Sequence, residues 1–597
     1  MENRKRRPGG IANWAARFNR CVASSFIGRY FRLEGNHQPK EITGSTFLNE
    51  LRAGATTFAA MTYIIAVNAS ILSQTGGPCL CDEKNRIDCD KVASYATCKE
   101  EVRRDLVMAT SAIAALSSFM FGLVTNLPIA LAPGMGLNAY FAFQVVGYNG
   151  SGNIPYGVAL TAVFAEGLIF VFLALTGMRQ WLVKLIPSTI KTATGAGIGL
   201  FLSEIGLAYG TGIGAITGGW NATPLAIAGC PIEKINPQTQ MCDGGVMSSP
   251  KMWTAIFAGG LLTVYLMAFR VKYAFIIGIA LVSILSWPRN TSITYFPHTP
   301  EGDSRFELFS QITSFRPMKH TLNALDWDIG RHGTQFALAL FTFLYVDIID
   351  ATATMYSMVR FCGVMDDRDG DFPRSTLAYC CDAISISISA LLGCSPVTAF
   401  IESGAGIAEG GRTGLTAMTT GLCFLLAVIF GPIFASVPPW ATGCTLILVG
   451  CMMTRQITQI NWRYIGDTLP SFVVIAFVPF SYSVAYGIIA GMFLYTAINL
   501  MIAVTVRISG GRLEPQDYDM KEYWTWKAPG RKPWYVRVFR NVTHSGKNMN
   551  ESNMPAFHTS NGSDCEMVRV ASSDERKDNG VDASVSMPRR TLSKFSR

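Results

Sequence analysis

The stretch GLVTNLPIALAPGMGLNAYFAF, residues 122–143, shares its pattern with a second stretch, GCSPVTAFIESGAGIAEGG, residues 393–411. In each, a glycine-led turn is followed by a proline, a short apolar run, a Gly-x-Gly pair and a helical run. Proline and glycine interrupt a helix, so we expect each apolar run to be extended and the two runs to pair as a small sheet. Two matched interruptions in one chain are typical of a secondary transporter whose substrate site lies near the middle of the membrane.

The composition places these interruptions in a membrane protein. The chain has 597 residues, of which 49% are hydrophobic and 15% charged. A soluble chain carries about 25% charged residues. Apolar runs long enough to span a bilayer, which takes about 20 residues each, recur between residues 54 and 505. The sequence therefore predicts an all-α polytopic membrane protein.

We predict fourteen spans and an inverted internal repeat. The spans are 54–74, 105–124, 131–146, 156–177, 190–210, 252–269, 273–287, 333–357, 375–392, 397–409, 415–434, 440–454, 469–484 and 486–505. The interruptions fall in the third and tenth spans. Because seven spans is an odd number, the two halves are expected to have opposite orientations in the membrane.

The distribution of basic residues predicts the topology. An even number of spans puts both ends on one side, and Lys and Arg near span ends mark the cytoplasmic side. The N-terminus, MENRKRRPGG, is basic, as are the connections 179–191, 270–272 and 455–463. Both ends are therefore expected in the cytoplasm. The net charge of +9 follows this pattern and is not gathered into a nucleic-acid-binding patch.

Six cysteines fall in predicted outer loops, where an even number favours disulfides. Zinc binding is disfavoured because no histidine lies near them. These cysteines are Cys79, Cys81, Cys89, Cys98, Cys230 and Cys242.

Acidic residues stand inside the predicted spans, and we find no Lys or Arg at the centre of any span. The acids are Glu166, Glu204, Asp347, Asp350 and Glu402. Buried carboxyls without basic partners tend to hold a proton, and ionisable groups in membranes are usually functional. An interior that is acidic only favours proton or cation chemistry over inorganic anions. Glu166 and Glu204 belong to unbroken spans, where an inter-helix hydrogen bond is an equally good role.

The acidic pair and the interruptions are expected to meet. Asp347 and Asp350 are three residues apart and share nearly one helical face. Glu402 directly precedes the glycine-rich turn of the tenth span, and Asn138 follows the Gly-x-Gly of the third. These four polar side chains are candidates for one small site.

Three motifs carry a resemblance to a known family: APGMGLNAYF (132–141), DIIDATATM (347–355) and PVTAFIESGAGIAEGGRTGLTA (396–417). They resemble the AzgA-like purine permeases, the fungal hypoxanthine–adenine–guanine proton symporters of the nucleobase–cation symporter-2 type. The resemblance covers about residues 45–505. It implies two inverted seven-span repeats in a uracil-permease-like arrangement of core and gate domains, with short extended stretches in spans 3 and 10.

The resemblance also implies site residues and a division of the chain. Substrate binding maps to Asn138, Glu402, Asp347, Gly136, Ser403 and Gly404, and proton coupling to Asp347, Asp350 and Glu402. The expected parts are a cytoplasmic segment (1–50), core (51–180 and 333–435), gate (181–290 and 436–506), an extracellular loop (291–332) and a largely disordered cytoplasmic tail (507–597).

The expected function is import of hypoxanthine, adenine and guanine across the plasma membrane by proton symport. The proton is the coupling ion, and we expect no enzymatic activity, catalytic residue, metal, cofactor or nucleic-acid partner. A homodimer is common in this fold. Two alternatives remain: a carrier of the same fold for xanthine, urate or uracil, and an anion exchanger.

Overall fold

The structure is a computed structural model. It describes residues 10–36, 41–79, 89, 92–152, 154–178, 187–208, 212–217, 226–227, 247, 249–271, 273–310, 317–364, 372–481, 483–510, 513, 515 and 518. These residues all lie in the first of two units of the chain, Met1–Val538. The predicted tail, 507–597, lies almost entirely outside the described residues.

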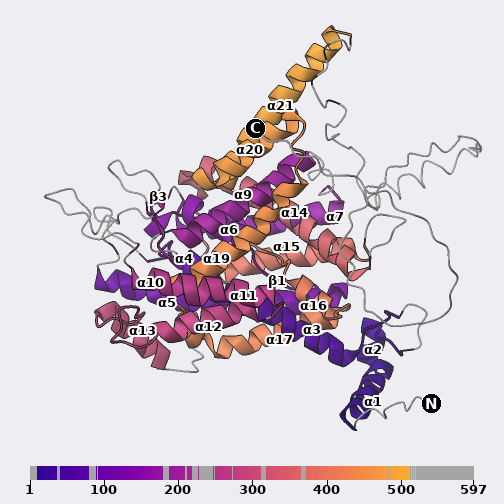
Figure 1. The fold of residues 1–597 in the computed structure, drawn as a ribbon, viewed down its shortest axis with the longest axis vertical. Helices are drawn as coiled ribbons and strands as arrows, with labels where there is room; N and C mark the ends of the chain where they lie inside the picture. The colour runs from indigo at the N-terminus through magenta and orange to yellow at the C-terminus, as the bar shows by residue number, and fades with distance from the viewer. Residues whose placement is uncertain are drawn as a thin grey trace, which may run out of the picture. The chain divides into compact units, whose positions relative to one another are not determined.

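Among the described residues of the first half, the regular elements are helices and three short strands (Figure 1). Two helices, α1 (Gly10–Ser24) and α2 (Phe26–Phe31), precede the membrane part. The remaining elements are α3 (Phe47–Met61), α4 (Tyr63–Ser73), α5 (Ala93–Thr125), β1 (Leu131–Pro133), α6 (Met135–Ala139), the π-helical η3 (Tyr140–Val145), η4 (Tyr148–Gly150), α7 (Tyr156–Thr176), α9 (Ser188–Leu207), β2 (Ile216–Thr217), β3 (Ala226–Ile227), α10 (Pro250–Thr254), the π-helical η7 (Ala255–Leu261), α11 (Leu262–Ala268), α12 (Ala274–Ser286) and α13 (Pro300–Ser310).

The second half repeats this organisation. Its elements are η8 (Ile329–Arg331), α14 (Gly333–Cys362), α15 (Ser375–Leu391), β4 (Val397–Ala399), α16 (Ser403–Ala408), α17 (Gly414–Ile429), α18 (Gly431–Ala435), α19 (Pro439–Thr454), η9 (Arg455–Gln459), α20 (Ile465–Phe480) and α21 (Val484–Ile508).

Each of the fourteen predicted spans corresponds to a helix or to a broken helical segment. Within the described residues, six helices are long and apolar enough to cross a membrane, and shorter apolar helices accompany them. The largest boundary error is in the second span. Its helix, α5, begins at Ala93, well before the predicted start at residue 105, and so includes the charged stretch that precedes the apolar run.

The two interrupted segments pair as predicted. Strand β1 runs antiparallel to β4, with Leu131 opposite Ala399 and Pro133 opposite Val397. A Cβ atom on Gly134 would lie 2.9 Å from Cγ2 of Thr398, so the close approach of the two segments requires glycine at this position. Both strands are buried, which satisfies the requirement that non-helical backbone in a membrane be enclosed by protein.

Helix packing follows the inverted repeat. Helix α5, in the second span, packs against α17 in the eleventh, and their repeat counterparts, α15 and α7, pack against each other. Helix α19 packs against its own counterpart, α9. This symmetric pairing, together with the antiparallel β1–β4 pair, defines a helical membrane transporter built from two inverted halves.

The described contacts also separate the helices into two groups. Helices α3, α4, α5, α7, α15 and α17 pack mainly with one another, whereas α9, α19, α20 and α21 form a second set. That the first group is a moving core and the second a gate remains a prediction.

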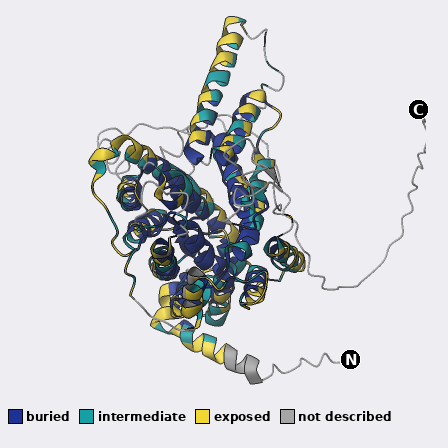
Figure 2. Ribbon diagram, turned by 90° about the vertical axis from the view of Figure 1, so that its left-hand side faces the viewer, coloured by how far each residue is buried: buried dark blue, intermediate teal, exposed yellow. Residues whose placement is uncertain are grey.

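Apolar side chains are exposed along the helix surfaces. On α21, Phe493, Leu500, Met501 and Ile508 are each at least 66% exposed. Figure 2 shows the same helix with exposed and intermediate residues along most of its length. Large exposed apolar surfaces of this kind suit contact with lipid.

The connection between α12 and α14, predicted to be a loop (291–332), contains the helix α13. The sequence interpretation missed its start signals: Pro300 occupies the first helical position, and the Thr299 hydroxyl accepts a hydrogen bond from the Gly302 N–H at 3.2 Å.

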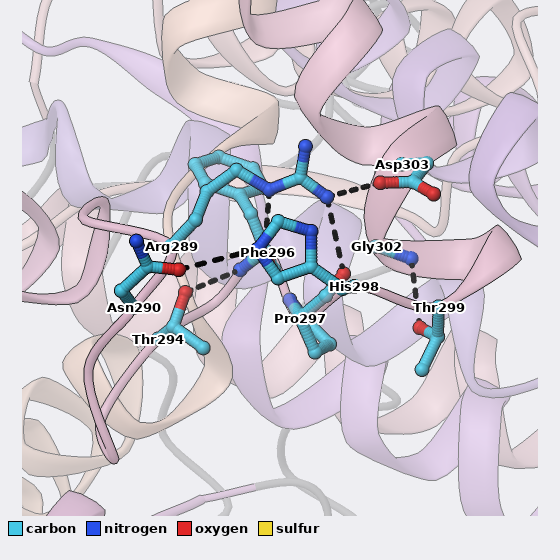
Figure 3. A network of polar contacts seen from close by, with 9 residues as sticks. All are labelled: Arg289, Asn290, Thr294, Phe296, Pro297, His298, Thr299, Gly302 and Asp303. Atoms are coloured by element: carbon cyan, nitrogen blue, oxygen red, sulfur yellow. Dashed lines mark hydrogen bonds and ion pairs between the residues drawn. The ribbon is translucent and has the colours of Figure 1, made fainter.

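The guanidinium of Arg289 links two parts of this connection. It pairs with Asp303 and donates to the Phe296 carbonyl at 3.2 Å (Figure 3).

Three of the six cysteines with predicted disulfides lie in the described residues. Cys79 is bonded to Cys98, and Cys89 is also disulfide-bonded. Cys81, Cys230 and Cys242 lie outside the described residues.

Candidate functional site

Hydrogen bonds hold the two interrupted segments together at the predicted site. Besides the β1–β4 pair, the Gly134 N–H donates to the Pro396 carbonyl at 2.9 Å, and the Phe400 N–H donates to the Ala130 carbonyl at 3.1 Å. The hydroxyl of Ser403 accepts a hydrogen bond from the Ala130 N–H at 3.0 Å. Ser403 therefore joins the two segments, a structural task that the sequence did not indicate.

Glu402 lies where the second interruption ends and α16 begins, and it is half-buried. Its Oε1 atom accepts a hydrogen bond of 2.7 Å from the hydroxyl of Tyr63, the first residue of α4. The Tyr63 ring is 2% exposed and lies 5.6 Å from the ring of Phe275. Glu402 is thus held in one orientation by a residue of the first span.

Asn138, from the first interruption, is fully buried. Its Oδ1 accepts a hydrogen bond from the Ser395 hydroxyl, which belongs to the second interruption. Within the described residues its Nδ2 has no hydrogen-bond partner. A buried amide with an unused donor suits a ligand that offers an acceptor.

The two predicted site glycines have different surroundings. A Cβ atom on Gly136 would lie 2.7 Å from Cγ2 of Ile198 on α9, so Gly136 allows close packing between α6 and α9. At Gly404 the nearest atom would be Sδ of Met358 at 3.7 Å, an ordinary contact. Packing therefore explains glycine at position 136, whereas a Cβ atom at Gly404 would make only ordinary contacts with Met358 and Phe361.

The acidic pair of α14 faces two different environments. Asp350 is half-buried, and Glu402 is the acid that influences it electrostatically. Asp347 is fully buried, and its main electrostatic neighbours are Asp382 and Glu166. Asp350 also acts electrostatically on Asp347, so the two acids remain neighbours while each meets acids from other helices.

We call Tyr63, Asp350 and Glu402 the Glu402 cluster, and Glu166, Asp347 and Asp382 the buried carboxyl cluster. The second cluster brings together α7, α14 and α15, and each of its members is 0% exposed. The carboxyl oxygens of Glu166 and Asp347 have no hydrogen-bond partner in the described part of the chain.

The sequence interpretation missed two members of these clusters. Asp382 carries the same signal that identified Asp347, a carboxyl inside an apolar span, and could have been found from it. Tyr63 carries no such signal, because a tyrosine in an apolar run is usually a packing residue of the helix interface. No group of three or more His, Cys, Asp or Glu side chains suited to a metal ion occurs among the described residues.

Inverted halves with paired interruptions and enclosed carboxyls define a secondary transporter. The model of the Permease family, the xanthine/uracil permeases, matches residues 92–490. The chain belongs to this family and is therefore a transporter of the nucleobase permease class, not an enzyme.

Three relatives show the range of the similarity. The chain is 54% identical over 533 residues to "Efflux pump notK'" of Aspergillus versicolor, which covers 89% of this chain and 92% of the relative. It is 53% identical to "Putative xanthine/uracil permease C887.17" of Schizosaccharomyces pombe, covering 89% and 84%. It is 34% identical to "Guanine/hypoxanthine permease PbuG" of Bacillus subtilis, covering 76% and 90%.

Proposed function

We propose that this protein imports purine nucleobases, namely hypoxanthine, guanine and adenine, by proton symport across the plasma membrane. The observation that carries the proposal is the hydrogen bond between Tyr63 and Glu402 beside the paired interruptions. The similarity to a bacterial guanine/hypoxanthine permease supports purines as the substrate class.

The site has groups that match a purine. The Glu402 carboxylate can accept hydrogen bonds from ring N–H groups, and the Asn138 amide can donate to a ring nitrogen or carbonyl oxygen. A site built on hydrogen bonds rejects a base that leaves one of these buried groups unpaired.

The proposed coupling uses both clusters. In the buried carboxyl cluster, Asp347 carries the transported proton. Asp350, on the same helix as Asp347, couples the protonation of Asp347 to Glu402. Acidic medium outside favours the protonated, substrate-binding state, and the near-neutral cytosol favours release. Coupling of this kind requires that proton and substrate each bind one state better than the other.

The transport cycle follows from the proposed topology. Both ends of the chain lie in the cytoplasm, and the core moves against the gate to expose the site to each side in turn. The packing of α6 against α9 through Gly136 is one sliding contact between these parts. A homodimer would hold the gate still during the movement.

A second candidate is outward transport or a different base. One relative, 54% identical, is named as an efflux pump, and another, 53% identical, is named as a putative xanthine/uracil permease. Direction and specificity are both open to direct measurement.

Labelled hypoxanthine uptake by cells expressing the protein tests the proposal. We expect faster uptake at acidic than at neutral external pH, abolished by a protonophore, and competition by guanine and adenine but not by uracil or xanthine. If only uracil or xanthine competes, the proposed purine specificity is wrong and the second candidate holds. If preloaded base leaves the cells against its gradient and no uptake occurs, the protein exports its substrate.

A further inference from the structure

A cavity of about 270 Å³ lies away from the Glu402 cluster. It is lined by the end of α4, by the charged first turns of α5 and by Trp440 at the start of α19. It is slightly smaller than the roughly 300–1,000 Å³ pockets that hold drug-sized ligands, which suits a single heterocyclic base. The proposed topology puts this cavity on the extracellular side.

The charged groups that line the cavity are mainly basic. Lys99, Arg103 and Arg305 face one carboxylate, Glu100, which gives three positive charges against one and an excess of +2. Oε1 of Glu100 accepts from Nε and Nη2 of Arg305 at 2.7 and 2.6 Å, and the Lys99 ammonium donates to Oδ1 of Asn149 at 3.1 Å. Arg103 is 5% exposed and donates to the Val437 carbonyl at 2.5 Å, so it is a fixed part of the wall. Such a lining suits a ligand edge that is rich in acceptors.

Aromatic rings complete the wall. The rings of Tyr295 and Trp440 both line the cavity, and their centroids are 5.8 Å apart. The connection that carries Tyr295 is held by the Arg289 network shown in Figure 3. Arg103 and Arg305 lie over the Tyr295 ring and Lys251 lies over the Trp440 ring, so the rings help to hold the basic groups beside the cavity.

Helix α4 connects the cavity with the Glu402 cluster. Tyr63, Ser70 and Gln74 are offset by seven and eleven residues, close to two and three helical turns, so they share one face. Tyr63 donates to Glu402, whereas Ser70 and Gln74 line the cavity. The two places are therefore about 10 Å apart along the helix axis at their nearest positions.

We propose that this cavity is an entry site that binds oxopurines before they reach Glu402, and that Arg305 and Lys99 select for them. The inference rests on the proposed function. Guanine and hypoxanthine present two adjacent acceptors, the 6-oxygen and N7, and each can accept a hydrogen bond from a lysine ammonium or an arginine N–H group. Adenine presents a donor in place of the 6-oxygen, so the basic lining discriminates against it.

The test compares apparent affinities of hypoxanthine, guanine and adenine in Arg305→Gln and Lys99→Gln, by uptake or competition, at matched surface levels. Arg331→Gln is the matched control, because Arg331 is exposed, precedes α14 and does not line the cavity. We expect each test variant to weaken hypoxanthine and guanine at least about fivefold relative to adenine.

Equal shifts for all three bases, or no shift, would overturn the entry site. If Arg305→Gln does not reach the surface because its pairing with Glu100 is lost, the ratio in Lys99→Gln decides. Failure of the unaltered protein to bind or transport any purine would instead reject the proposed function, so the two failures are distinct.

Discussion

The Tyr63 hydroxyl donates a 2.7 Å hydrogen bond to Oε1 of Glu402, and this bond joins the first span to the second interruption. The two residues are 339 positions apart in the chain. Because the bond holds a carboxylate that faces the proposed substrate, it makes the orientation of Glu402 depend on α4.

Tyr63→Phe removes this bond and leaves the ring in place. A hydrogen bond to a charged group contributes about 1.5–3 kcal/mol, so we expect the apparent affinity for hypoxanthine to fall about tenfold or more. Tyr464→Phe is the matched control, since Tyr464 is also buried and donates to Asn499 on α21. Concentration-dependent uptake measures both, and equal affinities would show that Tyr63 does not orient the site.

Asp347→Asn and Asp350→Asn should separate coupling from binding. Asp347 belongs to the buried carboxyl cluster, so its asparagine variant should bind hypoxanthine but lose accumulation against a gradient. Asp350 neighbours Glu402, so its variant should lose affinity. Accumulation ratios and binding to isolated membranes measure the two effects, with the exposed Asp328→Asn as control. Full, pH-dependent accumulation by Asp347→Asn would remove that residue from the proton path.

The interrupted segments were predictable, whereas the division of the acids between two clusters was not. The proline–glycine pattern acts locally, so two copies sufficed to predict β1 and β4. Asp347 and Asp350 share a helical face only approximately, because three residues rotate by about 300° and leave the side chains about 60° apart. Which neighbours they meet depends on α7, α15 and α16, whose positions are set by packing.

The sequence also misplaced the basic groups near the membrane. The predicted second span begins at residue 105, after Arg103 and Arg104, but both arginines are buried within α5. A span predicted from hydropathy begins where the apolar run begins. It therefore excludes helical turns that contain charged residues. The entry cavity was therefore not predictable from the sequence.

Ser403→Ala tests the link between the two interruptions. It leaves the buried Ala130 N–H without the acceptor that it has at 3.0 Å, at a cost of about 1–3 kcal/mol. We expect a lower unfolding temperature of the purified protein. Ser310→Ala is the control, because its hydroxyl is exposed and donates only to a nearby carbonyl. An unchanged unfolding temperature in Ser403→Ala would contradict the structural role.

Removing the Cys79–Cys98 disulfide should destabilise the loop that leads into α5. The bond closes a separation of 19 residues, and loops of this length are stabilised by about 3 kcal/mol when crosslinked. We expect Cys79→Ala/Cys98→Ala to unfold at a lower temperature and Cys21→Ala/Cys451→Ala, which changes two exposed free cysteines, to be unaffected. Equal unfolding temperatures would show that the bond does not stabilise this loop.

Direct binding of labelled hypoxanthine to the purified protein tests the central claim, that Glu402 at the paired interruptions binds the purine. Glu402→Gln should abolish saturable binding, whereas Glu409→Gln, the same change seven residues further on at a residue paired with Arg52, should bind normally. Unchanged affinity in a folded Glu402→Gln protein would contradict the account.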